Sequence, residues 1–96
     1  MPSNSAMKRL RVIYIGHVQG IGFRYTVCRS AEHCKVTGFV RNLPNGDVEM
    51  IAEGRETELV NLLNAVKSSS LRRYIADEKV SWSKAAGEFE KFGIRY

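Results

Sequence analysis

Between a strand-like run and a helix-like run, the chain reads Gly16-His17-Val18-Gln19-Gly20-Ile21-Gly22-Phe23-Arg24. Glycine has no Cβ atom, so a loop with three glycines can turn several backbone N–H groups toward one point. A helix that starts directly after such a loop adds the positive end of its dipole. The stretch therefore predicts a strand–loop–helix unit with a pocket for an anion the size of phosphate.

Hydrophobic periodicity places further elements around this loop. Residues 10–15 alternate as a strand whose two faces are both at least partly covered. Apolar residues at helical spacing predict a first helix of about three turns and, later, an amphipathic second helix that three serines end. The first set is Phe23, Val27, Ala31 and Cys34, and the second is Leu59, Leu62, Leu63 and Val66.

The middle of the chain predicts a β-hairpin. Its strands are expected at residues 37–43 and 47–53, joined by Pro44-Asn45-Gly46, whose Asn-Gly pair is available for positive φ. Alternation puts Val48, Met50 and Ala52 on one face of the second strand and Glu49 and Glu53 on the other. Gly54 is expected to break this pattern before the second helix.

The last third of the chain is less regular. Residues 71–77 fit either a loop or a strand edge, and residues 79–83 and 91–96 alternate as strands that could form a hairpin. The order β-α-β-β-α-β predicts an α+β fold, a two-layer α/β sandwich of ferredoxin-like topology with two helices on one face of an antiparallel sheet. This topology hosts enzymes, RNA-binding modules and metal carriers, so it does not name a function.

Length and composition predict one domain. The chain has 96 residues, of which 44% are apolar, and a polar tail over residues 1–7 is expected to precede a domain over residues 8–96. It has no apolar run long enough for a membrane span and no signal-peptide pattern at its start. Cys28 and Cys34 lie six apart on the predicted helix, so they point to different sides and are expected to stay reduced.

The formal net charge is +5, with basic residues scattered through the chain. An ordinary solvated surface is the favoured interpretation, and attraction of an anionic substrate or of nucleic acid are the alternatives.

Two polar residues are candidates for chemistry. Arg24 begins the first predicted helix, where a cation is unfavourable beside the helix dipole unless an anion lies between them, and its planar fork can bind two phosphate oxygens. Without such an anion it is a surface arginine. Asn42 lies in a strand, where asparagine is depleted, so its carboxamide could orient a water and an oxyanion. It could equally well bond the backbone of the adjacent turn.

Other chemistry has little support in the sequence. His17 could act as a general base, but a solvated loop histidine is commoner. No residues show metal-ligand spacing, no Ser-His-Asp or Cys-His arrangement can be argued, and no Gly-Lys-Ser/Thr closes the loop. No metal and no cofactor are therefore expected.

Three segments together resemble one protein family. Gly16 to Arg24, Gly38-Phe39-Val40-Arg41-Asn42 and Asn45-Gly46-Asp47-Val48-Glu49 are similar to the acylphosphatase family, and the likeness runs from about Arg9 to Tyr96. Departures are mild, with Ile21 where valine is common and His17 at a position that is often basic. Residues 68–77 match weakly.

The resemblance implies a small cytosolic hydrolase that cleaves acyl phosphates to a carboxylate and inorganic phosphate, without a metal or a covalent intermediate. A monomer without a cofactor is expected. It implies that Arg24 binds the phosphoryl group together with backbone amides of the loop, and that Asn42 positions the attacking water. Inorganic phosphate or sulfate would bind there like the product. The loop residues implied are Gln19, Gly20, Ile21, Gly22 and Phe23.

Two alternatives stay open. One is a non-catalytic accessory domain of the kind that occurs within larger maturation proteins, against which the presence of both Arg24 and Asn42 speaks. The other is an RNA-binding module, which stacks bases on aromatic residues of its first and third strands. Here the third predicted strand is acidic and has no aromatic residue, so no binding of nucleic acid is expected.

Overall fold

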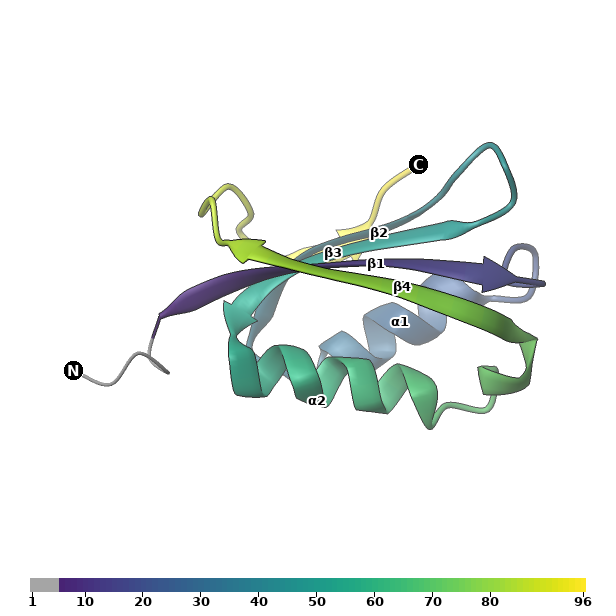
Figure 1. The fold of residues 1–96 in the computed structure, drawn as a ribbon, viewed down its shortest axis with the longest axis horizontal. Helices are drawn as coiled ribbons and strands as arrows, with labels where there is room; N and C mark the ends of the chain where they lie inside the picture. The colour runs from purple at the N-terminus through teal and green to yellow at the C-terminus, as the bar shows by residue number, and fades with distance from the viewer. Residues whose placement is uncertain (1–5) are drawn as a thin grey trace.

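The computed structural model describes residues 6–96 (Figure 1). The elements are β1 (Met7–Gly16), α1 (Phe23–Ala31), β2 (Val36–Asn42), β3 (Val48–Arg55), α2 (Glu56–Lys67), the 3₁₀ turn η2 (Arg72–Tyr74), β4 (Ile75–Lys84) and β5 (Phe92–Ile94). Of the tail expected over residues 1–7, residues 1–5 lie outside the described residues, and Met7 begins β1. None of the helices over residues 6–96 is long and apolar enough to cross a membrane.

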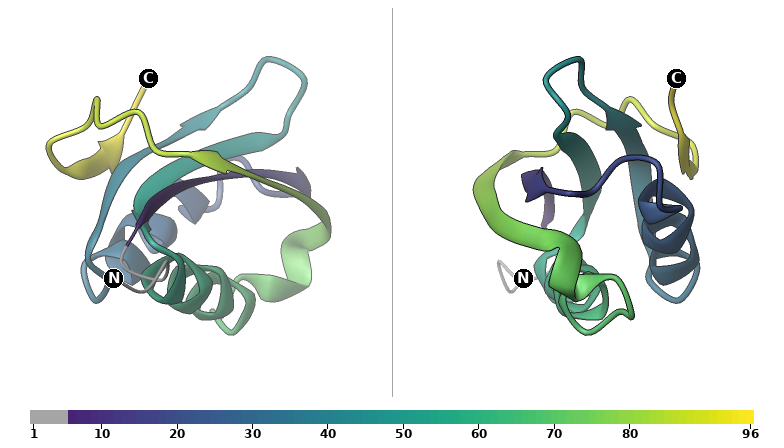
Figure 2. Two further views of the ribbon diagram at one scale, coloured as in Figure 1. Left: turned by 60° about the vertical axis from the view of Figure 1, so that its left-hand side comes forward. Right: turned by 90° about the vertical axis from the view of Figure 1, so that its right-hand side faces the viewer.

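The strands form one sheet in the order β4-β1-β3-β2-β5. Neighbouring strands are antiparallel from β4 to β2, and β5 adds to β2 in parallel. Both helices cover the same face of this sheet, as Figures 1 and 2 show. The predicted ferredoxin-like sandwich is therefore confirmed.

The last two strands lie at opposite edges of the sheet, so the interpretation of the C-terminal region as a hairpin is wrong. The connection between them is held on the sheet face that the helices leave free. There the buried carboxylate of Glu53 accepts hydrogen bonds from the backbone N–H groups of Ala86 at 2.8 Å and Gly87 at 2.9 Å. The chain is thereby directed across the sheet to β2, where Gly38 N donates to Lys91 O at 3.0 Å.

The core fills the space between the sheet and the helices. Alternate residues of the central strands and one stripe of each helix are removed from solvent, which forms the apolar core. They include Leu10, Val12, Tyr14, Val40, Val48, Met50, Ala52, Phe23, Val27, Leu59, Leu62 and Val66. The predicted inward face of β3 and the predicted stripe of α2 are thus confirmed.

Cys34 does not lie on the first helix, in contrast to the prediction. α1 ends at Ala31, and the chain then tightens into a turn in which His33 N bonds Ser30 O and Cys34 N bonds Ala31 O, at 3.3 and 3.0 Å. The apolar spacing in the sequence continues past the end of α1, because this turn keeps Cys34 packed against the core. That is why the prediction placed Cys34 on the helix. Both cysteines are free and half-buried.

Gly54 lies inside β3, so the expected break at this residue is wrong. A Cβ atom at Gly54 would lie 2.8 Å from the carbonyl oxygen of Lys35. Glycine is required there by the close approach of another backbone segment, and α2 begins only at Glu56. Of residues 71–77, which the sequence left open, Leu71 caps η2, and the rest form η2 and the start of β4.

Candidate active site at the carboxyl ends of two strands

The ends of β1 and β2 meet at one edge of the sheet. Both strands pair antiparallel with β3, so they run parallel to each other, and they end at Gly16 and Asn42. Figure 1 shows the loop after β1 and the turn after β2 at the same end of the molecule. α1 begins directly after that loop. The predicted site residues therefore belong to segments that meet at this edge.

Glycine is required at the start of the loop. Gly16 has a φ of +139°, and a Cβ atom there would lie 2.3 Å from the carbonyl oxygen of Tyr74. The same carbonyl accepts a hydrogen bond from His17 N at 3.0 Å, so η2 fixes the point where the loop leaves β1. Gly20 and Gly22 have φ values of +78° and +81°, which side chains with a Cβ rarely adopt.

The loop leaves its backbone donors unspent. Within residues 6–96, no backbone N–H from Val18 to Phe23 donates to a protein acceptor. Gly22 caps α1 without a side-chain hydrogen bond, and the first turn of α1 carries no acidic residue, whereas α2 has Glu56 and Glu58 in its first turn. The positive end of α1 and the loop amides are thus free for an anion.

The Gln19 side chain ties the loop to the β2–β3 turn. Its amide nitrogen Nε2 donates to the carbonyl oxygens of Leu43 and Asp47, each at 2.8 Å. Val18, next to it, is only 1% exposed and anchors the loop in the core. Because Leu43 follows Asn42 directly, these contacts fix the loop relative to Asn42. Sequence reasoning assigned Gln19 only through its backbone amide, and its side-chain role follows from the structure.

Arg24 lies at the start of α1 against the C-terminal residue. The central carbon of its guanidinium is 5.2 Å from the ring centroid of Tyr96. Just before Tyr96, Arg95 N donates to Val40 O at 2.9 Å, which holds the C-terminal segment along β2, two residues before Asn42. The right-hand view of Figure 2 shows this segment beside the start of α1. Over residues 6–96, Arg24 forms no salt bridge.

Asn42 has an unpartnered polar atom on the helix side of the sheet. Side chains two apart on a strand share a face, so Asn42 shares the face of the fully buried Val40. Its Oδ1 is buried and has no hydrogen-bond partner within the described residues. The turn is bonded without it, because Asp47 N donates to Asn45 Oδ1 at 3.0 Å and Leu43 N to Asp47 O at 2.8 Å. An unsatisfied buried acceptor costs on the order of 1–3 kcal/mol, which a bound water would relieve.

The other candidates lie apart from this arrangement. His17 is exposed. In the part of the chain that the structure describes, no three His, Cys, Asp or Glu side chains gather in a way that could hold a metal ion. On β1 and β3, the strands that would stack bases in an RNA-binding module, Tyr14 is the one aromatic residue, and it is fully buried on the helix side.

Comparison with known proteins identifies the family. A protein-family model described as Acylphosphatase matches residues 10–94. The chain belongs to the acylphosphatase family. It is 43% identical over 90 residues to a curated acylphosphatase of Bacillus licheniformis, an alignment that covers 94% of this chain and 100% of that protein.

Solved acylphosphatase structures have the same fold. The crystal structure of acylphosphatase from Bacillus subtilis superposes with a TM-score of 0.85 at 38% identity, over 93% of this chain and 99% of that one. An acylphosphatase from Coxiella burnetii superposes with a TM-score of 0.73 at 27% identity, over 99% and 100% of the two chains. The recognition of the family from the sequence is therefore confirmed. The individual roles of Arg24, Asn42 and the loop amides stay predictions.

Proposed function

We propose that the chain hydrolyses acyl phosphates, with Arg24 and the amides of Gln19 to Phe23 binding the phosphoryl group and Asn42 positioning the attacking water. Water supplies an OH group to phosphorus, the bond from phosphorus to the acyl oxygen breaks, and the products are a carboxylate and inorganic phosphate. One observation above all supports this: unspent loop amides, the free end of α1 and Arg24 are gathered at one edge of the sheet.

The phosphoryl group would lie in the loop. Backbone N–H groups at a helix N-terminus and an arginine fork are complementary to its oxygens. Charge on these oxygens is present in the ground state and in the transition state, so these contacts should contribute to both. The guanidinium carbon of Arg24 lies 5.2 Å from the ring centroid of Tyr96, but that ring is 97% exposed, so the contact restrains the guanidinium only weakly before substrate binds.

Asn42 would act mainly as the water attacks. A carboxamide can accept a hydrogen bond from the water and donate one to an oxyanion without itself titrating. The unpartnered Oδ1 supports this role, since it is an acceptor that a water could use. The substrate's own phosphate would take the proton of the water.

An acyl phosphate needs little more than this. Its carboxylate is a good leaving group, so holding the reactants in line and stabilising charge supplies most of the catalysis.

We also infer that the enzyme works as a monomer in the cytoplasm. The free thiols of Cys28 and Cys34 support that compartment. Because a single chain supplies every residue of the proposed site, no partner subunit is needed, and gel filtration tests this.

The assay is hydrolysis of benzoyl phosphate at neutral pH. The unmodified protein should release benzoate and inorganic phosphate, and added EDTA should leave the rate unchanged. Arg24→Gln should raise the Ki of inorganic phosphate and lower kcat, each by about tenfold or more. Arg29→Gln is the matched control, because Arg29 is an exposed arginine of the same helix whose bond goes to Tyr25. No turnover by the unmodified protein, or equal losses in both variants, would refute the proposed function.

A further inference from the structure

Two carboxylates on the free face of the sheet lie beneath arginines. Glu49 and Glu53 of β3 point away from the helices, yet they are only 5% and 3% exposed. Arg11 on β1 and Arg41 on β2 both donate to Glu49, from their Nε atoms, at 2.8 and 2.7 Å. The acidic strand that the sequence presents as repelling anions is therefore covered by cations on its solvent side.

These two arginines keep most of their donors free. Each binds Glu49 through Nε, and within residues 6–96 no acceptor is bound by the terminal amino groups of Arg11 or Arg41. Their side chains are 49% and 43% exposed, whereas the side chain of Glu49 beneath them is buried. Because the Glu49 carboxylate already fixes both arginine side chains, binding of an oxyanion would cost less side-chain entropy. Two guanidinium groups share one carboxylate, so the oxyanion would also meet a net positive charge.

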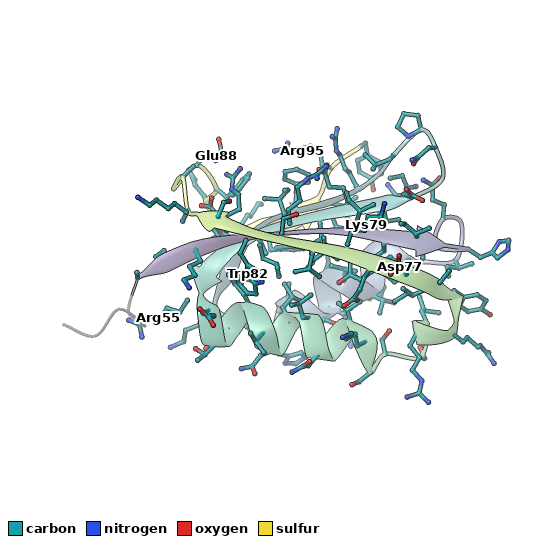
Figure 3. All side chains as sticks on the ribbon, in the orientation of Figure 1. Arg55, Asp77, Lys79, Trp82, Glu88 and Arg95 are labelled. Carbon is teal, nitrogen blue, oxygen red and sulfur yellow. The ribbon has the colours of Figure 1, made fainter. Side chains whose placement is uncertain are left out.

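A third guanidinium lies flat on a ring beside them. The central carbon of Arg95 is 3.8 Å from the ring centroid of Phe39, and Phe89 meets the same ring edge-on at 5.8 Å between centroids. Arg95 forms no salt bridge in the described part of the chain. A guanidinium stacked by one face keeps its other face free to stack on a flat ligand. Figure 3 shows Arg95 and Glu88 on the side of the sheet opposite the helices.

Arg41, Arg95 and the two phenylalanine rings line one hollow of about 360 Å³, within the range of small-ligand sites. Arg11 is not among its lining residues and adjoins it through the Glu49 carboxylate that it shares with Arg41. Phe39, Ile51 and Phe89 supply its apolar surface. Its polar surface comes from Arg9, Arg41, Arg95, Glu49 and Glu88, and Glu49 is already bound by Arg41 and Arg11. Glu88 is bound to Arg9, so its charge is compensated. The hollow therefore combines stacking surface with unspent guanidinium donors.

We propose that this hollow, called the outer-face site, binds a phosphate monoester with a flat aromatic body, the chemistry of a nucleoside monophosphate. The phosphate contacts the terminal amino groups of Arg41 in the hollow, with Arg11 beside it on the shared Glu49, and the ring stacks on the free face of Arg95. The outer-face site is separate from the phosphate loop. Arg41 and Asn42 are consecutive on β2, so their side chains point to opposite faces of the sheet.

The test is titration with AMP, followed by calorimetry and by the backbone amide signals of labelled protein. Saturable shifts are expected at Phe39, Arg41, Ile51 and Arg95. Adenosine, which lacks the phosphate, and inorganic phosphate, which lacks the ring, should each bind there at least tenfold more weakly. Unchanged AMP binding in Arg24→Gln would show that the outer-face site does not depend on the loop.

Two variants separate this site from general attraction to a basic protein. Arg95→Ala removes the stacking face without breaking a salt bridge and should weaken AMP binding at least tenfold. Arg73→Gln makes a similar change of charge at an arginine that stacks on Tyr74 instead, at 5.4 Å, and should change the affinity less than twofold. AMP shifts confined to residues 19–24, or equal losses in both variants, would overturn the proposal.

Discussion

The amide nitrogen of Gln19 donates to the carbonyl oxygen of Leu43 at 2.8 Å, which joins the glycine loop to the residue directly after Asn42. The same nitrogen donates to Asp47 O at 2.8 Å. One side chain thus sets the distance between the proposed phosphate-binding loop and the proposed water-positioning residue.

Gln19→Ala should therefore impair catalysis more than folding. Without the two bonds, the loop and Asn42 are no longer held in register, and misplacement by about an ångström costs on the order of 10²-fold in rate. We expect kcat on benzoyl phosphate to fall by 10- to 100-fold. Asn64→Ala, which removes an exposed amide of α2, is the control and should keep the full rate. A Gln19→Ala enzyme that retained full kcat would show that the two hydrogen bonds of the Gln19 side chain are not needed for turnover.

Asn42→Ala should separate binding from turnover. Its carboxamide is proposed to contact the water rather than the bound phosphate, so the Ki of inorganic phosphate should stay within about twofold of the original value. kcat should fall by on the order of 10²-fold, as for the loss of an oriented catalytic donor. Parallel measurement of kcat and of phosphate inhibition tests this. A large rise in the phosphate Ki would assign Asn42 to phosphate binding instead.

The sequence predicted the elements with strong local patterns. The stripe of Leu59, Leu62 and Val66 located α2, and the Asn45-Gly46 pair located the hairpin turn, where Gly46 has a φ of +98°. Both signals depend only on near neighbours in the chain, which is why they can be found without a structure.

What the sequence missed depends on distant contacts. Gly54 was expected to break β3 because glycine commonly ends a strand. The actual reason for glycine there is the close approach of the Lys35 backbone, which is remote in sequence and gives no local signal. The position of β5 depends on the hydrogen bonds that Glu53 accepts from the connection between β4 and β5. The alternation of apolar and polar residues gives no signal for such contacts. At the candidate site, the glycines and Arg24 were proposed from local pattern and stay predictions. The two hydrogen bonds of the Gln19 side chain could not be predicted, because the sequence does not show which turn lies beside the loop.

Gly38→Ala should be strongly destabilising. Gly38 has a φ of +141°, and a Cβ atom there would lie 1.9 Å from Ile51 O and 2.9 Å from Ala52 Cα, both atoms of the paired strand β3. Backbone atoms cannot move aside cheaply, so the free energy of unfolding should fall by roughly 3 kcal/mol. Gly93→Ala is the matched control, since nothing lies within 4 Å of its Cβ position. Urea denaturation of both variants should show a change below about 0.5 kcal/mol for the control.

Acid should destabilise the protein through its two covered glutamates. Burial alone would raise the pKa of Glu49, but hydrogen bonds from Arg41 and Arg11 outweigh it and hold that pKa below its ordinary value. Burial alone would also raise the pKa of Glu53. Hydrogen bonds from Ala86 N, Arg9 and Gly87 N outweigh burial and hold this pKa below its ordinary value. A carboxyl with a lowered folded pKa binds protons more readily when unfolded, so its contribution is full above the unfolded pKa of about 4.3 and is lost as pH falls below it.

The free energy of unfolding should accordingly be flat with respect to these two groups from pH 7 to about 5 and decline from there toward pH 3. Glu53→Gln should lower the stability at pH 7 by roughly 2 kcal/mol, because Arg9 and two backbone N–H groups lose a charged acceptor. Below pH 5, the free energy of unfolding of this variant should fall less steeply than that of the unmodified protein. Only Glu49, and no longer Glu53, then takes up a proton on unfolding. Urea denaturation across this pH range measures both slopes. An unchanged slope in Glu53→Gln would show that the carboxylate of Glu53 does not contribute to acid sensitivity.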